Sequence, residues 1–187
     1  SGPVSRIFKI EDNAGNVSRY EEPYVLYVDP YYPQVFDFKW IQGDPSTALS
    51  QPNSIILTKG LALKYFGNEI PQKSILGKEI FLNNKDAITV TGLIEDAPPT
   101  TSLKYTMLIP YEFFRVNNPY YSGNWSGNYQ GSTFVVLKKG QSPAMLEEQI
   151  TTWKKKYLKP EDDNRIGYRL QPLVQSHTDS KFGSPPQ

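Results

Sequence analysis

Few residues of this 187-residue chain belong to the types that perform covalent chemistry, and none falls into a catalytic spacing. His177 is the only histidine, next to Ser176 and close to Asp179. A hydrolase triad also needs a serine in a strained turn such as Gly-x-Ser-x-Gly, and the sequence lacks that motif. We therefore interpret His177 as an ordinary residue of a polar C-terminal tail.

Carboxylates offer two other routes to chemistry. Glu161 and Asp163 could join His177 around a metal ion, but their spacing matches no known ligand pattern. Glu95 and Asp96 are adjacent in an expected strand, so their side chains point to opposite faces and cannot easily flank one glycosidic bond. The chain also has no cysteine for a thiolate ligand or a disulfide. The sequence thus predicts no catalytic site, no metal site and no cofactor.

The residues best suited to binding lie in an expected exposed loop over residues 117–131. This loop is rich in Asn, Gly, Ser and Tyr, and unstructured loops of such length are more often functional than accidental. Its aromatic side chains are Tyr120, Tyr121, Trp125 and Tyr129. Exposed rings can stack on a sugar or anchor a protein partner, because they bury a large area at small entropic cost. The alternative is that Trp125 and Tyr129 fold back over an apolar face.

Composition and charge narrow the class of protein. Abundant Tyr and Phe, short runs of Val and Ile, 16 prolines and 13 glycines are typical of a β-rich α+β domain. The net charge of +1 argues against nucleic acid, because phosphate-binding proteins usually carry a clear basic excess. No apolar run approaches the roughly 20 residues that span a bilayer, and the first residues do not form a signal peptide. We expect the native polypeptide to begin upstream.

Apolar runs and turn residues predict the elements of the first half. Residues 4–10 and 17–28 should pair as a hairpin, and alternating aromatics over residues 31–40 should bury one face. A helical turn is expected over residues 44–49 and a strand over residues 53–58. A helix over residues 59–66 should begin at Thr58 and end at Gly67. Residues 78–82 and 87–94 should form a second hairpin.

The second half is predicted to add a strand over residues 103–110, one helical turn over residues 111–116, and strands over residues 133–138 and 166–173. Ser142 and Pro143 open the clearest helix, with acidic residues near its start and basic residues near its end, as the helix dipole favours. Its stripe of Leu146, Ile150 and Trp153 is expected to lie in the core.

Several short motifs follow one another along the chain in a characteristic order. They are Arg6–Ile10, Val28–Pro30, Phe36–Phe38, Gly43–Pro45, the stretch Asn53–Pro99 with its Ala62–Gly67, Leu76–Ile80 and Thr89–Ile94 segments, and Leu170–Leu173. In this order they resemble the MacB-type periplasmic core domain of ABC transporter permeases, in the MacB/FtsX-like permease family. The resemblance covers most of the chain and is strongest to members of Bacteroidetes type.

This resemblance implies two lobes, often called Porter and Sabre. Residues 1–42 and 132–187 would form the Porter-like α/β lobe, and residues 43–131 the inserted, β-rich Sabre-like lobe with its exposed loop. The domain would lie between the first and second transmembrane helices of a permease in the bacterial inner membrane, facing the periplasm. The permease would work with a cytoplasmic ATPase.

The implied function is to transmit conformational change and to bind a partner or substrate for export. The resemblance leaves open whether that partner is a periplasmic adaptor or a lipoprotein. The alternative is a free-standing carbohydrate or surface-ligand binding module. A permease needs apolar segments of about 20 residues outside both ends of this chain, whereas a secreted module needs only an amino-terminal signal.

Overall fold

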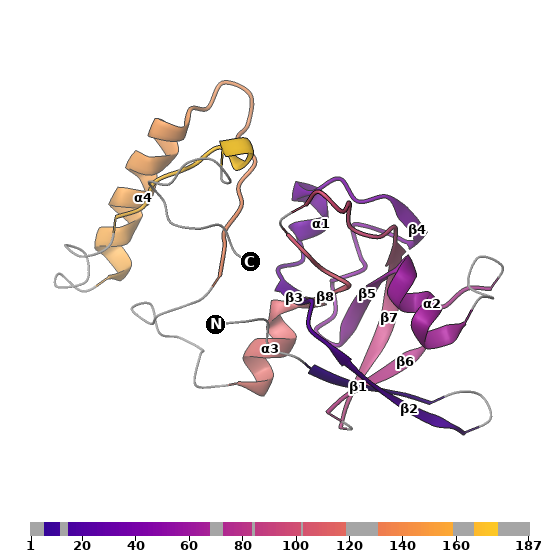
Figure 1. Cartoon of the computed structure of the whole chain (residues 1–187). Helices are drawn as coiled ribbons and strands as arrows, with labels where there is room; N and C mark the ends of the chain where they lie inside the picture. The colour runs from indigo at the N-terminus through magenta and orange to yellow at the C-terminus, as the bar shows by residue number, and fades with distance from the viewer. Residues whose placement is uncertain are drawn as a thin grey trace. The chain divides into compact units, whose positions relative to one another are not determined.

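The computed structural model in Figure 1 describes residues 6–11, 15–67, 73–83, 85–101, 103–118, 131–158 and 167–175. The chain divides into two compact units, residues 1–119 and 120–186. Among the described residues, no helix combines the length and the apolar character that crossing a membrane requires.

The first unit contains an eight-stranded sheet and helices that pack on it. Its strands are β1 (Arg6–Glu11), β2 (Val17–Glu22), β3 (Val25–Val28), β4 (Trp40–Gly43), β5 (Ser54–Thr58), β6 (Glu79–Leu82), β7 (Asp86–Ile94) and β8 (Met107–Pro110). Its helices are α1 (Tyr32–Val35), α2 (Lys59–Phe66) and α3 (Tyr111–Asn117). The second unit contains helix α4 (Pro143–Tyr157) and the short 3₁₀-helix η2 (Leu173–Gln175).

The sheet is mixed, in agreement with the predicted α+β class. Its strand order is β2-β1-β6-β7-β5-β8-β3, and β4 pairs with β7 beside this path. The pairs β5·β7 and β3·β8 are parallel and the others are antiparallel. Residue 42 is the predicted boundary between the Porter-like and Sabre-like lobes. Strands from both sides of it share one sheet, because β1 pairs with β6 and β3 pairs with β8.

The two ends of this path are adjacent in sequence. Only Pro23 and Tyr24 separate β2 from β3, and a trans backbone covers at most about 11 Å over that connection. A flat path of seven strands would hold its edges about 29 Å apart. The sheet must therefore curl until β2 and β3 approach each other at a sharp corner (Figure 1).

The main core lies on the inner face of this curled sheet. Alternating residues of β5 and β7 share that face, and α2 and α3 add Leu61, Ala62, Tyr65 and Phe113. The strand side chains of this cluster include Phe8, Ile55, Leu57, Ile80, Ile88, Val90, Leu93, Met107 and Ile109. Both helices therefore cover the same face of the sheet.

The opposite face is also buried near the centre of the sheet. Ile56 and Leu108 have no exposed surface there. A Cβ placed on Gly92 would lie 2.8 Å from Cζ3 of Trp40 and 3.0 Å from Cγ1 of Ile56. The glycine is therefore required for the close approach of the Trp40 ring to β7.

Helix α2 has the predicted bounds, but a distant residue caps its start. Thr58 is the N-cap, yet its side chain makes no capping hydrogen bond. The Gly60 N–H instead donates to Oδ1 of Asp96 at 2.9 Å. A Cβ on Gly60 would lie 2.9 Å from the same oxygen, so the glycine leaves room for this cap. Gly67 ends the helix with a φ of +79°, as predicted.

Other predictions for the first unit hold with adjusted bounds. The antiparallel pairs β1·β2 and β6·β7 confirm both hairpins, and Asn83 has the positive φ of 52° that its turn needs. Residues 17–28 form two strands rather than one, and β8 is shorter than residues 103–110. Residues 31–40 keep the predicted alternation in exposure around Phe36 and Phe38, but begin with α1. Residues 111–117 form a helix longer than one turn.

In the second unit, α4 confirms the predicted helix, and Ser142 caps it by accepting from the Met145 N–H at 3.3 Å. The predicted strands over residues 133–138 and 166–173 are wrong for the described residues, which include no strand there. A strand needs neighbours for its N–H and C=O groups, and none of the described strands pairs with these segments. The predicted core position of the α4 stripe is also wrong, because α4 buries no residue and Trp153 is 40% exposed.

Candidate functional site

The aromatic residues predicted to bind a ligand, Tyr120, Tyr121, Trp125 and Tyr129, lie outside the described residues. Their role stays a prediction. His177, Glu161 and Asp163 lie outside them as well.

The adjacent acids Glu95 and Asp96 have separate structural roles. Glu95 Oε1 lies 3.6 Å from Lys59 Nζ, whereas Asp96 caps α2 through Gly60. The described part of the chain holds no group of three or more His, Cys, Asp or Glu side chains that could bind a metal ion. Both carboxylates therefore serve the join between β7 and the start of α2.

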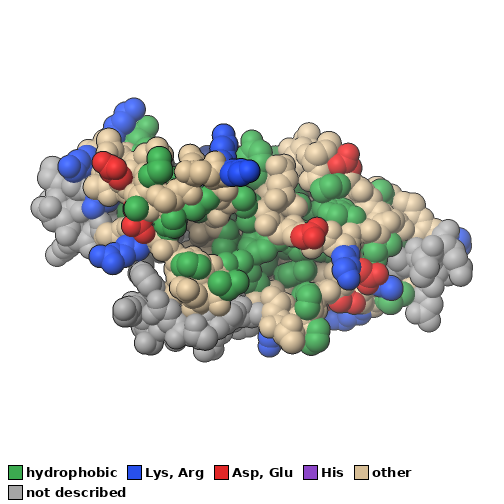
Figure 2. Space-filling model, turned by 90° about the horizontal axis from the view of Figure 1, so that it is seen from above, with side chains coloured by type: hydrophobic (Ala, Val, Ile, Leu, Met, Phe, Trp, Pro, Cys, Tyr) green, Lys and Arg blue, Asp and Glu red, His purple; other side chains and the backbone are tan. Residues whose placement is uncertain are grey.

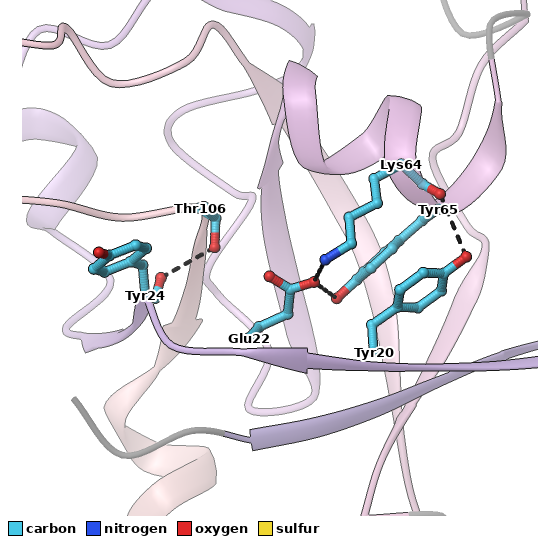
Figure 3. Close-up of polar contacts among 6 residues, drawn as sticks. All are labelled: Tyr20, Glu22, Tyr24, Lys64, Tyr65 and Thr106. Atoms are coloured by element: carbon cyan, nitrogen blue, oxygen red, sulfur yellow. Dashed lines mark hydrogen bonds and ion pairs between the residues drawn. The ribbon is translucent and has the colours of Figure 1, made fainter.

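A partly buried ion pair lies where β2 ends beside α2, and we call Glu22, Lys64 and Tyr65 the Glu22 clamp (Figure 3). Glu22 Oε1 accepts from Lys64 Nζ at 2.6 Å and from the Tyr65 hydroxyl at 3.2 Å. The Glu22 side chain is only 5% exposed, whereas that of Lys64 is 46% exposed. The clamp therefore fastens the closing edge of the curled sheet to α2.

The ring of Tyr20 completes this arrangement. It lies 4.8 Å from the Tyr65 ring between centroids, 5.1 Å below Lys64 Nζ, and its hydroxyl donates to the Lys64 carbonyl at 3.4 Å. Burial raises the pKa of Tyr65. The negative charge of Glu22, and the hydrogen bond that the Tyr65 hydroxyl donates to it, raise that pKa further. Tyr65 therefore stays a hydrogen-bond donor over the physiological pH range.

Sequence reasoning missed the clamp, although one signal pointed to it. Tyr20 and Glu22 are two residues apart on β2, so their side chains lie on the same face, which packs against α2. Nothing local indicates that this face meets Lys64, which lies 42 residues further along the chain.

A shallow hollow of about 270 Å³ opens beside the β2–β3 corner, and we call it the corner hollow. It lies between that corner and the segment that connects β7 with β8. Its lining consists of rings, prolines and a few polar side chains: Tyr24, Asp96, Ala97, Pro98, Pro99, Thr101, Lys104, Tyr105 and Thr106.

The walls of the corner hollow are held by contacts with the rest of the sheet. Thr106 donates twice to the Tyr24 carbonyl, from its N–H at 2.9 Å and from Oγ1 at 3.3 Å (Figure 3). The ring of Tyr105 packs edge-on against Phe38, with centroids 5.5 Å apart. These contacts hold the walls in place, so the hollow is preformed. Burial, with a smaller effect of the negative Asp96, raises the pKa of Tyr105.

The corner hollow is bordered by a positively charged side chain, Lys104. Nζ of Lys104 lies 6.0 Å from the centroid of the Tyr24 ring. Among the described residues, no carboxylate forms an ion pair with Lys104. The arrangement can hold an apolar group against rings and prolines and attract a negative charge beside it.

On the face that Figure 2 draws, basic and acidic side chains alternate, and apolar side chains gather between them. That face carries no broad basic field over the described residues, unlike a surface that grips a phosphate backbone.

Comparisons with known proteins agree with the resemblance. Residues 3–153 match the family model described as MacB-like periplasmic core domain. The crystal structure of a domain of a putative permease protein from Porphyromonas gingivalis is 25% identical and has a TM-score of 0.61, with 92% of this chain and 76% of that chain covered. No curated protein matches the chain.

The periplasmic region of MacB from Actinobacillus actinomycetemcomitans has the same fold at 18% identity. Its TM-score is 0.52, and the match covers 82% of this chain and 63% of that chain. Since the family model spans most of the sequence, this chain belongs to the MacB-like periplasmic core domains of ABC transporter permeases.

Proposed function

We propose that this domain couples ATP-driven movement of a membrane-embedded permease to the binding of a periplasmic partner or of a substrate for export. The family match over residues 3–153 carries the proposal. In it, a cytoplasmic ATPase drives the permease, and flanking helices hold the domain at the outer face of the inner membrane. No catalytic role is proposed, because the family is one of transporter domains.

The first unit is suited to move as a rigid body. Its sheet curls until the edge strands β2 and β3 meet at a corner, and the Glu22 clamp ties that corner to α2. Packed cores deform little, so a displacement applied at one point is passed on as a rotation or translation of the whole unit. The division into a Porter-like lobe (1–42 and 132–187) and a Sabre-like lobe (43–131) remains a prediction. Residues 6–28 share one sheet with residues 54–110, so in our proposal they move together. The first unit then moves as a whole relative to the residues beyond 119.

We also propose two contacts for the partner, which would be an adaptor or a lipoprotein. The first is the aromatic loop with Tyr120, Tyr121, Trp125 and Tyr129, and its support is composition alone. The second is the corner hollow, which is supported by its preformed rings and its cation.

Cell fractionation tests the location. Membranes of the source cells are washed with alkaline carbonate and probed with an antibody against this domain. A band far larger than 21.3 kDa that resists the wash is expected. A small band released by the wash would contradict the permease.

Distance measurements test the coupling in the full-length permease reconstituted with its ATPase. The 187 residues contain no cysteine, so once any cysteine elsewhere in the permease is replaced, a pair of introduced cysteines carries the only fluorophores. One pair, Val17→Cys and Met145→Cys, reports between the units, and a control pair, Val17→Cys and Tyr111→Cys, reports within the first unit; all three positions are exposed. ATP should change energy transfer for the first pair and leave the control pair unchanged. An unchanged first pair through the ATP cycle would contradict the coupling.

A further inference from the structure

We propose that the corner hollow binds a peptide segment that carries an apolar side chain next to an acidic residue. This inference rests on the proposed partner-binding function of the domain and names the chemistry of that partner. The rings and the cation of the hollow belong to the first unit and lie among the described residues.

The apolar part of the hollow sets the size of the anchor. Sites for whole small molecules usually enclose about 300–1,000 Å³, and the corner hollow has about 270 Å³. Because the hollow is shallow and lies at the lower limit of that size range, one large side chain or a proline fits it better than a complete ligand. Tyr24, Tyr105 and the pair Pro98 and Pro99 offer rigid apolar surface, and little side-chain entropy is lost when a peptide covers it.

Charge decides which peptide fits. Lys104 forms no ion pair with a described carboxylate, so its ammonium group is available to an acidic residue of the peptide. Asp96 also borders the hollow and its negative charge acts on Tyr105, but one of its oxygens accepts from the Gly60 N–H at the start of α2, where the helix dipole offsets part of that charge. The hollow therefore favours an acidic peptide over a basic one.

Two hydroxyls of the hollow already make one hydrogen bond each within the protein, and each keeps further hydrogen-bonding capacity. Thr106 Oγ1 already donates to the Tyr24 carbonyl, and Thr101 Oγ1 already accepts from the Leu103 N–H. A sugar ring needs several polar groups that converge on its hydroxyls. An apolar anchor needs none of them.

The preformed walls reduce the entropy lost on binding. The Thr106 hydrogen bonds hold the Tyr24 side of the hollow, and the Phe38 contact holds Tyr105. Binding then orders mainly the peptide, which favours measurable affinity for a short segment.

Amide chemical shifts of the ¹⁵N-labelled 187-residue chain test the proposal. Two capped probes are titrated, acetyl-Gly-Pro-Leu-Glu-Glu-amide and its matched basic form acetyl-Gly-Pro-Leu-Lys-Lys-amide. The acidic probe should shift the amides of Tyr24 and residues 101–106 in a saturable way. Lys104→Ala should weaken its binding about threefold, as expected for a solvent-screened ion pair.

Lys78→Ala is the matched control, because Lys78 Nζ also lies over a ring, 5.0 Å from the centroid of Phe66, but outside the hollow. It should leave binding unchanged. Equal shifts with both probes, shifts spread beyond the hollow, or unchanged binding by Lys104→Ala would each overturn the proposal. A response of the same amides to phosphatidylglycerol vesicles alone would do so too. None of these results would alter the ATP-dependent distance between the units, so the two proposals can fail separately.

Discussion

The Glu22 clamp allows a direct test of how burial sets the strength of an ion pair in this domain. We consider Glu22→Gln, which keeps the shape and an acceptor for Tyr65, and Lys64→Met, which keeps most of the stem. Together with the double variant they form a double-mutant cycle that measures the coupling energy of the pair. The fold should survive both changes, because neither removes a core side chain.

The magnitude follows from the geometry. A hydrogen bond to a charged group contributes about 1.5–3 kcal/mol, and the 2.6 Å contact with a 5% exposed Glu22 favours the upper part of that range. Lys64 is 46% exposed, so solvent screens part of the attraction. We therefore expect a coupling energy of about 1–2 kcal/mol. Lys64→Met alone should destabilise more than Glu22→Gln alone, because it leaves a buried carboxylate with Tyr65 as its remaining donor among the described residues.

A second ion pair of equal length provides the control. Arg115 donates two hydrogen bonds to the Glu112 carboxylate, at 2.6 and 2.7 Å, but both side chains are about half exposed. Urea unfolding followed by circular dichroism at pH 7 gives the midpoint and slope for each cycle. The Glu112→Gln and Arg115→Met cycle should show clearly smaller coupling at an unchanged slope. Equal coupling energies in the two cycles would refute the reasoning from burial.

Three further predictions concern packing, titration and capping. Gly92→Ala should destabilise the first unit by about 1–3 kcal/mol, because the new methyl group overlaps buried side chains; thermal unfolding checks this, and Gly131→Ala, in open space, should have little effect. The pKa of Tyr65 is raised by burial, so only the unfolded state ionises just above pH 10, and stability should fall as pH rises from there. Tyr65→Phe should make that alkaline loss shallower in urea midpoints, and an unchanged loss in this variant would contradict the role given to Tyr65. Ser142→Ala should weaken the first turn of α4 by about 1 kcal/mol, and amide exchange at that turn should quicken; unchanged exchange would contradict the cap.

Local patterns predicted most elements of the first unit. The helix over residues 59–66 was predicted at both ends, because Thr58 and Gly67 are local start and stop signals. The hairpins followed from turn residues that accept positive φ, as Asn83 does. The same kind of pattern misled in the second unit, where residues 133–138 alternate like a strand but no described strand pairs with them.

The candidate site could not be predicted in the same way. Tyr24 and Lys104 are far apart in sequence, and they meet because the sheet curls and the β7–β8 connection returns to the β2–β3 corner. The Asp96 cap of α2 is similar, since its partner Gly60 is 36 residues away. Periodicity shows which side of a strand is buried but not which segment covers it.

The sequence by itself determined the α+β class, the bounds of α2, the start of α4, and, through the order of short motifs, the family that residues 3–153 confirm. These features depend on backbone preferences and on neighbours within a few residues. Only the tertiary structure decided that the edge strands β2 and β3 approach each other, that Glu22 is buried against Lys64, and that rings and a lysine border one hollow. The physical reason is that these contacts depend on how strands distant in sequence pair with one another. The local preference of a single side chain does not determine that pairing.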